Sequence, residues 1–549
     1  MKPTLANLLA HHARRCPERV AFRFDRCFDR CFDGDFAARD ITFTQLQAEA
    51  NRLANAWLDA GLAPGDKVAT LLPNSFELVA AFWAASVSGI VIVPCSTLLQ
   101  ENAVAQLLRD SESQCVIAHA SQAAVLDSMR GKSNGDRGDK SDNSDNNDIA
   151  QQIGDRFILT EIPPSSEPPP GFQTYSQFTA DASTATPATN AAIDGDSIYN
   201  IMYSSGTTGA PKGIVHSHAV RAMYGALFAN AWRMTPESVV LHAGALVFNG
   251  AMLSFMPWLY LGCKFILHAR FDAEKFIDAI AVNRVTHIVL VPAQIIALLN
   301  SAAFAPAKLE SLQMLCAVGA PLHLTYKQRL IEQLPGRFYE LYGVTEGFMT
   351  ILDNADAPRK LESVGCAAAF TDIRIVDEHD EACAPGVIGE ICGRGPLLMQ
   401  GYYRRPDATA AAMRGDWLHS GDLGTMDADG FVYLVDRKKD MFTSGGVNVY
   451  PRDIEEVVAR HPGVDEVAVF GTADAKWGEA AVAAVTGARD LDADELVEWV
   501  NQRVDAKFQR IKAAWILDAF PRNAAGKILK RELRARYCDG DGGDDNANE

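Results

Sequence analysis

The segment Tyr203–Gly213, which reads YSSGTTGAPKG, has the composition of a phosphate-binding loop. Glycines let the backbone curl so that its N–H groups converge on an anion, while hydroxyl side chains add donors and a lysine adds positive charge. The spacing of its glycines and its lysine is not that of a Walker A loop. The residues expected to contact phosphate are Ser204, Ser205, Gly206, Thr207, Thr208, Gly209 and Lys212. The alternative is an ordinary surface turn rich in glycine, serine and threonine.

The elements around this loop predict an α/β fold. The residues before it, Ser197–Tyr203, are apolar and partly β-branched, which indicates a buried strand. The loop therefore leaves the end of a strand, where α/β proteins usually bind ligands. Helical and strand patterns alternate on both sides of it, with helices expected at Thr44–Ala60, Phe76–Ser88, Phe271–Asn283 and Leu322–Leu334, and strands at Val68–Leu72, Ile90–Val93, Thr286–Val291, Leu315–Val318 and Phe338–Leu341. This alternation predicts mostly parallel sheets with helices on their faces.

The last third of the chain changes character twice. Residues 363–435 contain short strands separated by glycines, which suggests a β-barrel-like subdomain. After the charged segment Asp436–Asp440 the pattern resets to a small α+β domain, with helices at Pro451–Arg460 and Leu491–Lys507 and strands at Val464–Phe470 and Ala514–Leu517. We therefore expect an N-terminal domain over 1–435 with two α/β parallel-sheet subdomains and the β-barrel-like one, a hinge at 436–440, a small mobile C-terminal domain over 441–537 and a disordered acidic tail over 538–549.

Composition limits the function and the compartment. The chain has 549 residues and a net charge of -18. Because an acidic protein repels nucleic acid phosphates, we expect no nucleic-acid partner. Its 11 cysteines include no CxxC pair, which fits a reduced cytoplasmic environment better than a disulfide framework or a zinc site. No apolar stretch is long and uncharged enough to predict a membrane span. The segment 129–148 lacks aromatic and branched aliphatic residues and is expected to be a disordered insertion, and the insertion at 25–40 has no assigned role.

Seven motifs follow one another along the chain in a fixed order. They are YSSGTTGAPKG, VGAPL (Val318–Leu322), ELYGVTE (Glu340–Glu346), GEICGRGPLLMQGYYRRP (Gly389–Pro406), WLHSGDLG (Trp417–Gly424), DRKKDMFTSGGVNVYP (Asp436–Pro451) and PRNAAGKILKRELR (Pro521–Arg534). Together they resemble the adenylate-forming superfamily of acyl-CoA synthetases, luciferases and peptide-synthetase adenylation domains, from about Leu5 to Arg536. The resemblance implies an enzyme in which a carboxylate attacks the α-phosphate of ATP, and a thiol then displaces AMP from the acyl-adenylate. It also implies ATP, Mg²⁺ and coenzyme A.

The resemblance assigns residues to the nucleotide. The loop at 204–212 would hold the β- and γ-phosphates. Adenine would lie between the ring of Tyr342 and the backbone at Gly319, which suits a stacking site. Asp422 would accept hydrogen bonds from the ribose hydroxyls, and Arg437 would add a second ribose contact. The remaining residues expected to bind ATP are Ala320, Pro321, Glu340, Leu341 and Gly343.

The resemblance also assigns catalytic and transfer roles. Thr345 would contact the α-phosphate, and Glu346 would hold Mg²⁺, a hard cation that prefers oxygen ligands. Lys527 would bridge the carboxylate and the α-phosphate. The small domain is expected to rotate between the two half-reactions about Lys439. In the second orientation Ser444, Gly445 and Gly446 would face the site and leave room for the pantetheine arm of CoA.

The chain departs from many relatives at the acid site. They carry an aromatic-histidine pair where this chain has Phe248-Asn249, and an asparagine cannot carry positive charge. With Val318 and Phe348 these residues are expected to form a mostly apolar acyl pocket. We expect a hydrophobic acid, with a fatty acid favoured over an aryl or cyclic acid. An enzyme that loads a separate carrier protein, and a non-catalytic scaffold protein, are the other open classes.

Overall fold

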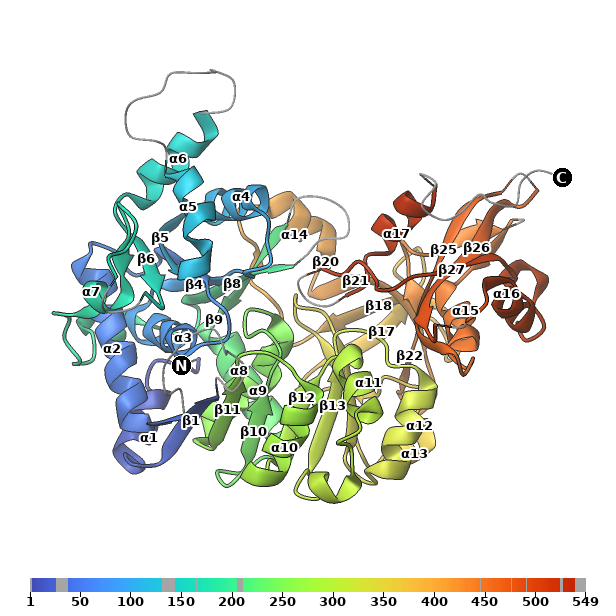
Figure 1. The fold of residues 1–549 in the computed structure, drawn as a ribbon, viewed down its shortest axis with the longest axis horizontal. Helices are drawn as coiled ribbons and strands as arrows, with labels where there is room; N and C mark the ends of the chain where they lie inside the picture. The colour runs from blue at the N-terminus through green and yellow to red at the C-terminus, as the bar shows by residue number, and fades with distance from the viewer. Residues whose placement is uncertain are drawn as a thin grey trace.

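The computed structural model describes residues 2–25, 38–130, 144–162, 166–204, 211–444, 446–474, 476–489, 491–523 and 527–538. Figure 1 shows a large N-terminal part in blue to light orange and a small C-terminal part in dark orange to red. The large part contains two big sheets and a curled antiparallel sheet, and the small part has a sheet of its own. This is the α/β architecture with a small α+β domain that the sequence predicts.

The first large sheet has nine strands in the order β16-β15-β14-β13-β12-β10-β11-β1-β2. Its inner strands are parallel, and antiparallel strands stand at both edges. The strands are β1 (Val20–Asp25), β2 (Arg39–Thr42), β10 (Val239–His242), β11 (Lys264–His268), β12 (His287–Leu290), β13 (Met314–Val318), β14 (Phe338–Gly343), β15 (Met349–Leu352) and β16 (Cys366–Ala367).

The second large sheet has eight strands in the order β19-β9-β8-β4-β3-β5-β6-β7. Strands β8, β4, β3, β5, β6 and β7 pair parallel with one another along this path, whereas β9 and β19 are added antiparallel at the β8 end. The strands are β3 (Lys67–Leu71), β4 (Val91–Pro94), β5 (Ser113–His119), β6 (Phe157–Thr160), β7 (Gln173–Thr174), β8 (Ile198–Ser204), β9 (Lys212–Ser217) and β19 (Gly401–Tyr402).

Four helices fill the space between the two large sheets, and their buried side chains form one continuous core with the inner faces of both. These helices are α2 (Phe43–Asp59), α3 (Phe76–Ser88), α8 (His218–Ala231) and α9 (Met252–Leu261). Helix α3 is buried at every position from Leu78 to Ser88, as its nearly continuous apolar sequence requires. Ser75 caps its N-terminus, and Gly89 ends it in a left-handed conformation.

The outer face of each sheet has its own helices and core. The eight-stranded sheet is covered by α4 (Glu101–Ser111), α5 (Ala123–Met129) and α6 (Ser144–Ile153), and the nine-stranded sheet by α10 (Ala273–Asn283), α11 (Pro292–Asn300) and α12 (Leu324–Gln333). Shorter or peripheral helices are α1 (Leu8–Arg15), α7 (Tyr175–Thr179), α13 (Ala357–Lys360) and α14 (Pro406–Ala412).

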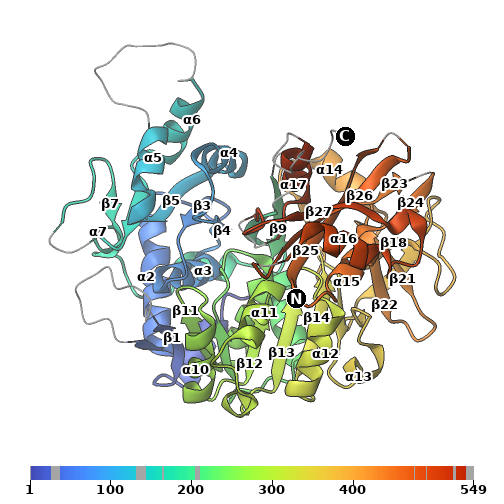
Figure 2. The same ribbon diagram turned by 45° about the vertical axis from the view of Figure 1, so that its right-hand side comes forward.

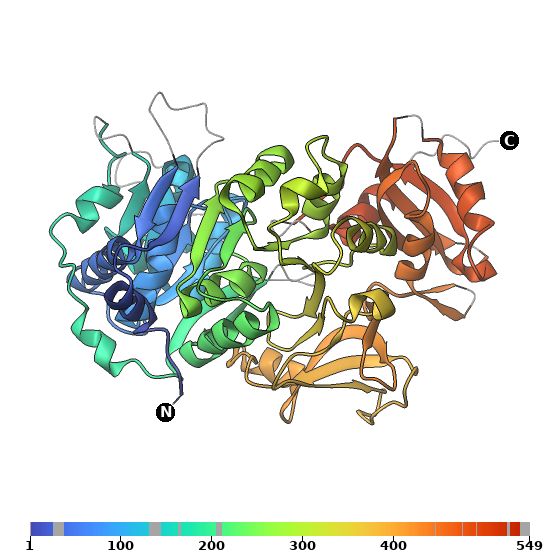
Figure 3. The same cartoon turned by 90° about the horizontal axis from the view of Figure 1, so that it is seen from below.

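The curled sheet follows the nine-stranded sheet in the chain and lies beside it, in yellow and orange in Figure 3. All its pairings are antiparallel, so it forms the expected half-barrel. Its strands are β17 (Asp372–Val376), β18 (Gly389–Arg394), β20 (Met413–Arg414), β21 (Trp417–Met426) and β22 (Val432–Arg437).

The C-terminal domain has a five-stranded sheet with helices, and it contacts α12 of the large domain (Figure 2). His323 and Tyr326 at the start of α12 meet Glu456 and the backbone of Asp465. The elements are β23 (Phe442–Ser444), β24 (Val447–Val449), α15 (Pro451–Val458), β25 (Val464–Asp474), β26 (Gly478–Gly487), α16 (Ala493–Asn501), β27 (Ile511–Ile516) and α17 (Lys530–Arg536).

Two sequence expectations need correction. The helix expected at Leu491–Lys507 ends at Asn501, because the amide of Asn501 hydrogen-bonds both the backbone N–H and the carbonyl of Ile511 and turns the chain into β27. The segment expected to be disordered at 129–148 includes the start of α6, which is held by the buried side chains of Ile149 and Ile153. Residues 131–143, 26–37 and 539–549 lie outside the described residues. In the described part of the chain no helix is long and apolar enough to cross a membrane.

Candidate active site

Two segments expected to bind the nucleotide emerge side by side from the nine-stranded sheet. The segment Val318–Pro321 ends β13, and Tyr342–Glu346 ends β14, its parallel neighbour. The carboxyl ends of adjacent parallel strands meet at one edge, so both segments face the same space. Gly319 has φ +93°, a conformation that a residue with a Cβ adopts only under strain. Its exposed backbone can approach a flat ligand, which fits the predicted stacking site.

A hydrogen-bonded cluster joins Tyr342 to the half-barrel. Asp422 is 7% exposed and accepts a hydrogen bond of 2.9 Å from the Tyr342 hydroxyl. The Nε atom of Arg437 lies 3.3 Å from the other oxygen of this carboxylate. Asp422 and Arg437 are direct partners on the antiparallel strands β21 and β22, which explains why residues of two separate motifs meet. The three predicted nucleotide residues therefore form one site.

Lys527 reaches the same cluster from the C-terminal domain. Two hydrogen bonds with Asn523 hold its backbone. The side-chain oxygen of Asn523 accepts from the Lys527 N–H at 2.9 Å, and the backbone N–H of Asn523 donates to the Lys527 carbonyl at 2.9 Å. Burial, helped by the positive charge of Arg437, lowers the pKa of Lys527 from 10.5 to about 8, against the opposing pull of Asp422 and Asp440. Lys527 follows Asp422 by 105 residues in the sequence, and the docking of the small domain brings the two groups together.

The turn that carries Thr345 and Glu346 is held from the eight-stranded sheet. Nε2 of His216, on β9, donates to the Thr345 carbonyl at 2.9 Å. The Tyr402 hydroxyl donates to Oε1 of Glu346 at 2.8 Å, and the Nζ atom of Lys212 lies 4.7 Å from the centre of the Tyr402 ring. The end of the glycine-rich loop and the predicted metal ligand are thus neighbours across one tyrosine.

Glu346 fits Mg²⁺ only together with phosphate. Among the described residues no group of three or more His, Cys, Asp or Glu side chains could hold a metal ion. Mg²⁺ is commonly bound by one or two carboxylates, with substrate phosphates and water completing its shell. A single half-buried carboxylate beside the phosphate-binding segments suits that mode. When bound, the ion would neutralise phosphate oxygens.

Strands β8 and β9 carry the glycine-rich loop between them. They pair antiparallel, with Ser204 opposite Lys212, so the loop closes a hairpin at the edge of the eight-stranded sheet. The backbone N–H of Tyr403 donates to the Gly213 carbonyl at 2.7 Å and fixes the far end. Ser205, Gly206, Thr207, Thr208 and Gly209, with the side chain of Ser204, lie outside the described residues, and their role stays a prediction.

The acid-pocket residues divide into two groups. Phe248 and Val318 both pack at the edge of the central core, and Asn249 is half-buried between them and helix α8. Phe348 is 1% exposed and lies inside the half-barrel core, where the absence of a side chain on Gly393 makes room for its ring. The ring of Phe348 thus packs in the half-barrel core rather than beside Phe248 and Val318, and its role in the acid pocket stays a prediction.

Glu340 and Leu341 turn their side chains into the protein. Glu340 is 3% exposed and forms a buried ion pair with Lys327 of α12, while Leu341 packs in the central core. A contact of either residue with ATP would have to use the backbone. Gly343 and Pro321 are exposed and Ala320 is half-exposed beside Tyr342, where a ligand can reach them.

The predicted hinge is a short turn after β22. The N–H of Lys438 donates to the Gly421 carbonyl at 3.1 Å, and Lys439 stands exposed at the turn. Asp436 accepts from the backbone N–H of Arg437 and of Arg452 in the small domain, and burial raises its pKa to about 6. Ser444 pairs with Gly478 inside the C-terminal sheet, Gly446 is exposed at φ +82°, and Gly445 lies outside the described residues. In this arrangement Lys527 faces the nucleotide residues.

Sequence reasoning missed four polar residues of the site: His216, Arg221, Tyr224 and Tyr402. Asn249 accepts from Nη1 of Arg221 at 2.8 Å and donates to the Tyr224 hydroxyl at 3.1 Å. An arginine and a tyrosine three positions apart in an otherwise apolar helix were the available signal, since that spacing places them on one face.

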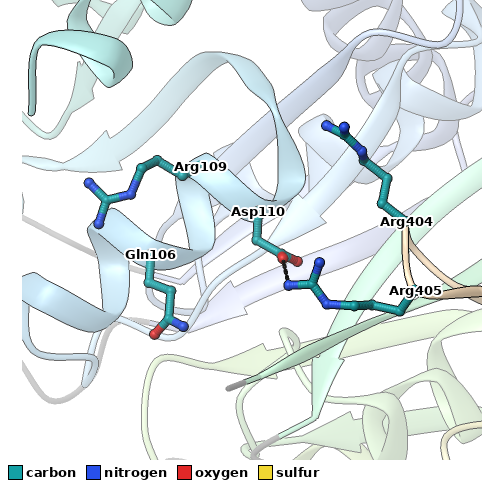
Figure 4. A pocket seen from close by; sticks show the side chains of 5 residues that line it. All are labelled: Gln106, Arg109, Asp110, Arg404 and Arg405. Carbon is teal, nitrogen blue, oxygen red and sulfur yellow. Dashed lines mark hydrogen bonds and ion pairs between the residues drawn. The ribbon is translucent and has the colours of Figure 1, made fainter. Parts of the chain in front are cut away.

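A separate surface pocket of about 400 Å³ lies between α4 and the segment after β19, lined by Gln106, Arg109, Asp110, Arg404 and Arg405. Figure 4 shows Arg405 reaching Asp110, with Arg404 directed away from it. Arg404 pairs with Glu112, and Asp110 also accepts from the Tyr203 hydroxyl at 2.7 Å. These carboxylates neutralise the charge of the arginines. Through Tyr203 they also hold strand β8, which leads into the glycine-rich loop.

Comparison with known proteins agrees with this geometry. Residues 9–403 match the family model described as AMP-binding enzyme, and residues 453–527 match the AMP-binding enzyme C-terminal domain. A feruloyl-CoA synthase of Amycolatopsis is 32% identical over 511 residues, covering 90% of this chain and 94% of the relative. The long-chain-fatty-acid–CoA ligase FadD13 of Mycobacterium tuberculosis is 34% identical over 523 residues, covering 90% and 93%.

A solved structure gives the same result for the fold. The ATP-bound crystal structure of MatB from Rhodopseudomonas palustris has a TM-score of 0.81 and 27% identity, over 98% of this chain and 99% of that one. The two family models together cover most of the chain, and the second one ends at Lys527. The chain therefore belongs to the AMP-binding, adenylate-forming family of enzymes.

Proposed function

We propose that this AMP-forming acid–CoA ligase activates a hydrophobic carboxylic acid, with a fatty acid as the favoured substrate. The acid would attack the α-phosphate of ATP to give an acyl-adenylate and pyrophosphate, and CoA would then displace AMP. The observation that carries the proposal is the meeting of Lys527 with Asp422 and Arg437, since a cation at that point stabilises charge that develops on the α-phosphate.

The residue roles follow from position. Tyr342 and Gly319 bind adenine, Asp422 and Arg437 hold the ribose, and the loop ending at Lys212 holds the leaving pyrophosphate. The Thr345–Glu346 turn faces the α-phosphate, where Glu346 would hold Mg²⁺. Because the groups are fixed by hydrogen bonds from two sheets, they need little rearrangement when ATP binds.

The second half-reaction would use the same site in another arrangement. Rotation about Lys439 would remove Lys527 and bring the Ser444–Gly446 hairpin tip to the nucleotide, leaving space for pantetheine. Gly446 at the tip of this hairpin is exposed and the hinge is a short turn, which supports the proposed movement.

The apolar setting of the acid pocket supports a hydrophobic substrate. Phe248 and Val318 pack on the central core, and the described contacts of Asn249 involve an arginine and a tyrosine but no carboxylate that could bind an α-amino group. An aryl acid is the second candidate, because the feruloyl-CoA synthase is almost as similar to this chain as the fatty acid ligase.

A screen of pyrophosphate release over acids of varied chain length and ring content tests the proposal. We expect activity with ATP and a fatty acid, rising with chain length, and consumption of the thiol of free CoA. Preference for cinnamate- or benzoate-like acids would favour the aryl alternative. Consumption of an acyl carrier protein instead of CoA would identify a carrier-loading enzyme, and no release with any acid would refute the proposed reaction.

A further inference from the structure

Arg221 is a fully buried cation without a carboxylate partner. It lies in α8, between the two large sheets, and is 0% exposed. None of the ion pairs found in the described part of the chain includes it. Guanidinium groups stay protonated in proteins, and burial of an unpaired charge is costly. A buried cation of this kind is suited to stabilise an anionic ligand that binds nearby.

The donors of Arg221 are all directed at neutral groups. Nε donates to Asn200 at 2.8 Å and Nη1 to Asn249 at 2.8 Å. Nη2 donates to Nδ1 of His216 at 3.1 Å and to the sulfur of Met202 at 3.2 Å. The guanidinium carbon also lies 4.8 Å from the centre of the Tyr224 ring. These hydrogen bonds use four of the five N–H groups of the side chain. Because the side chain is fully buried and most of its donors are engaged, we expect Arg221 to act through its partners.

Two of those partners, Asn249 and His216, lie toward the places proposed for the acid and for the α-phosphate. Asn249 stands at the proposed acid pocket, next to Phe248. His216 is neutral, because burial and the adjacent Arg221 charge hold its pKa well below the ordinary value. Its Nδ1 accepts from Arg221, so Nε2 carries the proton and donates to the Thr345 carbonyl. Arg221 thus connects the acid pocket to the turn expected at the α-phosphate.

We propose that Arg221 is the cationic positioning residue of the acid site: through Asn249 and His216 it orients the pocket and the Thr345 turn, and its charge attracts the substrate carboxylate. This inference rests on the proposed function. It also explains the chain's departure from an aromatic-histidine pair. With a permanent cation behind position 249, an asparagine suffices there, whereas a second positive charge beside Arg221 would be repelled.

The test measures acid-dependent pyrophosphate release by neutral and charged variants at position 221. Arg221→Met removes the charge and keeps an unbranched apolar side chain, and Arg221→Gln is a second neutral variant should the first fail to fold. We expect either to lower kcat/KM for the acid by about 10- to 100-fold. Arg221→Lys should recover part of the loss. KM for ATP and transfer from preformed acyl-adenylate to CoA should change little.

Rescue by a second substitution separates charge from packing. In the double variant Arg221→Met with Asn249→His, the cation moves to position 249, where the histidine is charged only at low pH. We expect activity to recover as the pH falls and to be lost as it rises, a profile that neither the wild type nor Arg221→Met should show. Arg156→Met is the matched control, because Arg156 also donates to neutral groups, the carbonyls of Gln114 and Ala60, far from the site.

The outcomes are distinct. A folded Arg221→Met or Arg221→Gln enzyme with wild-type kcat/KM for the acid, or a double variant without the pH-dependent recovery, would overturn the inference. Loss in the Arg156→Met control of the same size would mean that a general packing defect is being measured. If the wild-type enzyme releases no pyrophosphate with any acid, the proposed function fails first.

Discussion

The most direct test of the site is the pH dependence of adenylate formation, because one group is expected to control it. Lys527 has to be protonated to stabilise negative charge at the α-phosphate. Its pKa is lowered to about 8 in the free enzyme, so the cation is present below pH 8 and is lost as the pH rises through that value. The pH profile of kcat/KM reports ionisations of the free enzyme. We therefore expect kcat/KM for ATP to be halved near pH 8.

The size of the effect follows from the titration. One pH unit above the pKa only about a tenth of the lysine remains charged, so kcat/KM at pH 9 should be about tenfold below its plateau. An ordinary exposed lysine, with a pKa near 10.4, would give a flat profile over this range. The two profiles differ because Lys527 is buried beside Arg437 when the small domain is docked on the large one.

The assay is acid-dependent exchange of labelled pyrophosphate into ATP between pH 6.5 and 9.5, with transfer from preformed acyl-adenylate to CoA measured in parallel. Lys527→Ala should reduce exchange by about 100-fold or more, with no fall above pH 8, and leave transfer largely intact. Lys476→Ala, at an exposed lysine of the same domain, is the matched control. A flat wild-type profile would refute the assignment of Lys527, and equal loss of both half-reactions in Lys527→Ala would refute domain rotation.

Four further substitutions test other parts of the site. Tyr342→Phe removes one hydrogen bond to Asp422, worth about 1 kcal/mol, and should raise KM for ATP about fivefold; an unchanged KM would show that Asp422 does not need this partner. Glu346→Gln should raise the Mg²⁺ concentration for half-maximal pyrophosphate exchange, with Tyr402→Phe giving a smaller shift in the same titration; an unaltered Mg²⁺ requirement in Glu346→Gln would exclude this carboxylate as the ligand. Glu340→Ala leaves Lys327 buried without its carboxylate and should lower the free energy of unfolding in urea by about 3–5 kcal/mol, whereas a normal urea midpoint with a raised KM for ATP would make Glu340 a nucleotide ligand.

Local sequence pattern predicted the elements well and their side-chain directions less well. The helix Phe76–Ser88 has the bounds expected from its apolar run between Ser75 and Gly89. Motif order placed Asp422 and Arg437 in one site, and strand pairing in the half-barrel brings them together. The packing of Phe348 could not be predicted, because the direction of a side chain after a tight turn depends on the turn, and the space beside Gly393 is visible only in three dimensions.

The contacts of Arg221 could not be read from the sequence at all. Its partner Asn249 is 28 positions away, and His216 and Asn200 come from two strands whose antiparallel pairing sets their distance. An arginine in an apolar helix is usually interpreted as a residue whose charged end reaches solvent. Here helices fill the space between two sheets, so no solvent lies within reach, and tertiary structure decides the role of the residue.

The layer of helices between the sheets also bears on how such enzymes diversify. Residues proposed to form or orient the acid pocket come mainly from α8 and the segment before α9, with Val318 from the end of β13, whereas those for ATP come from strand ends, the half-barrel and the small domain. Substitutions in the helical layer can therefore remodel the acid pocket while the nucleotide chemistry stays intact. An engineer who wishes to redirect the enzyme to a bulkier or shorter acid would vary α8 and α9 and leave the motifs untouched.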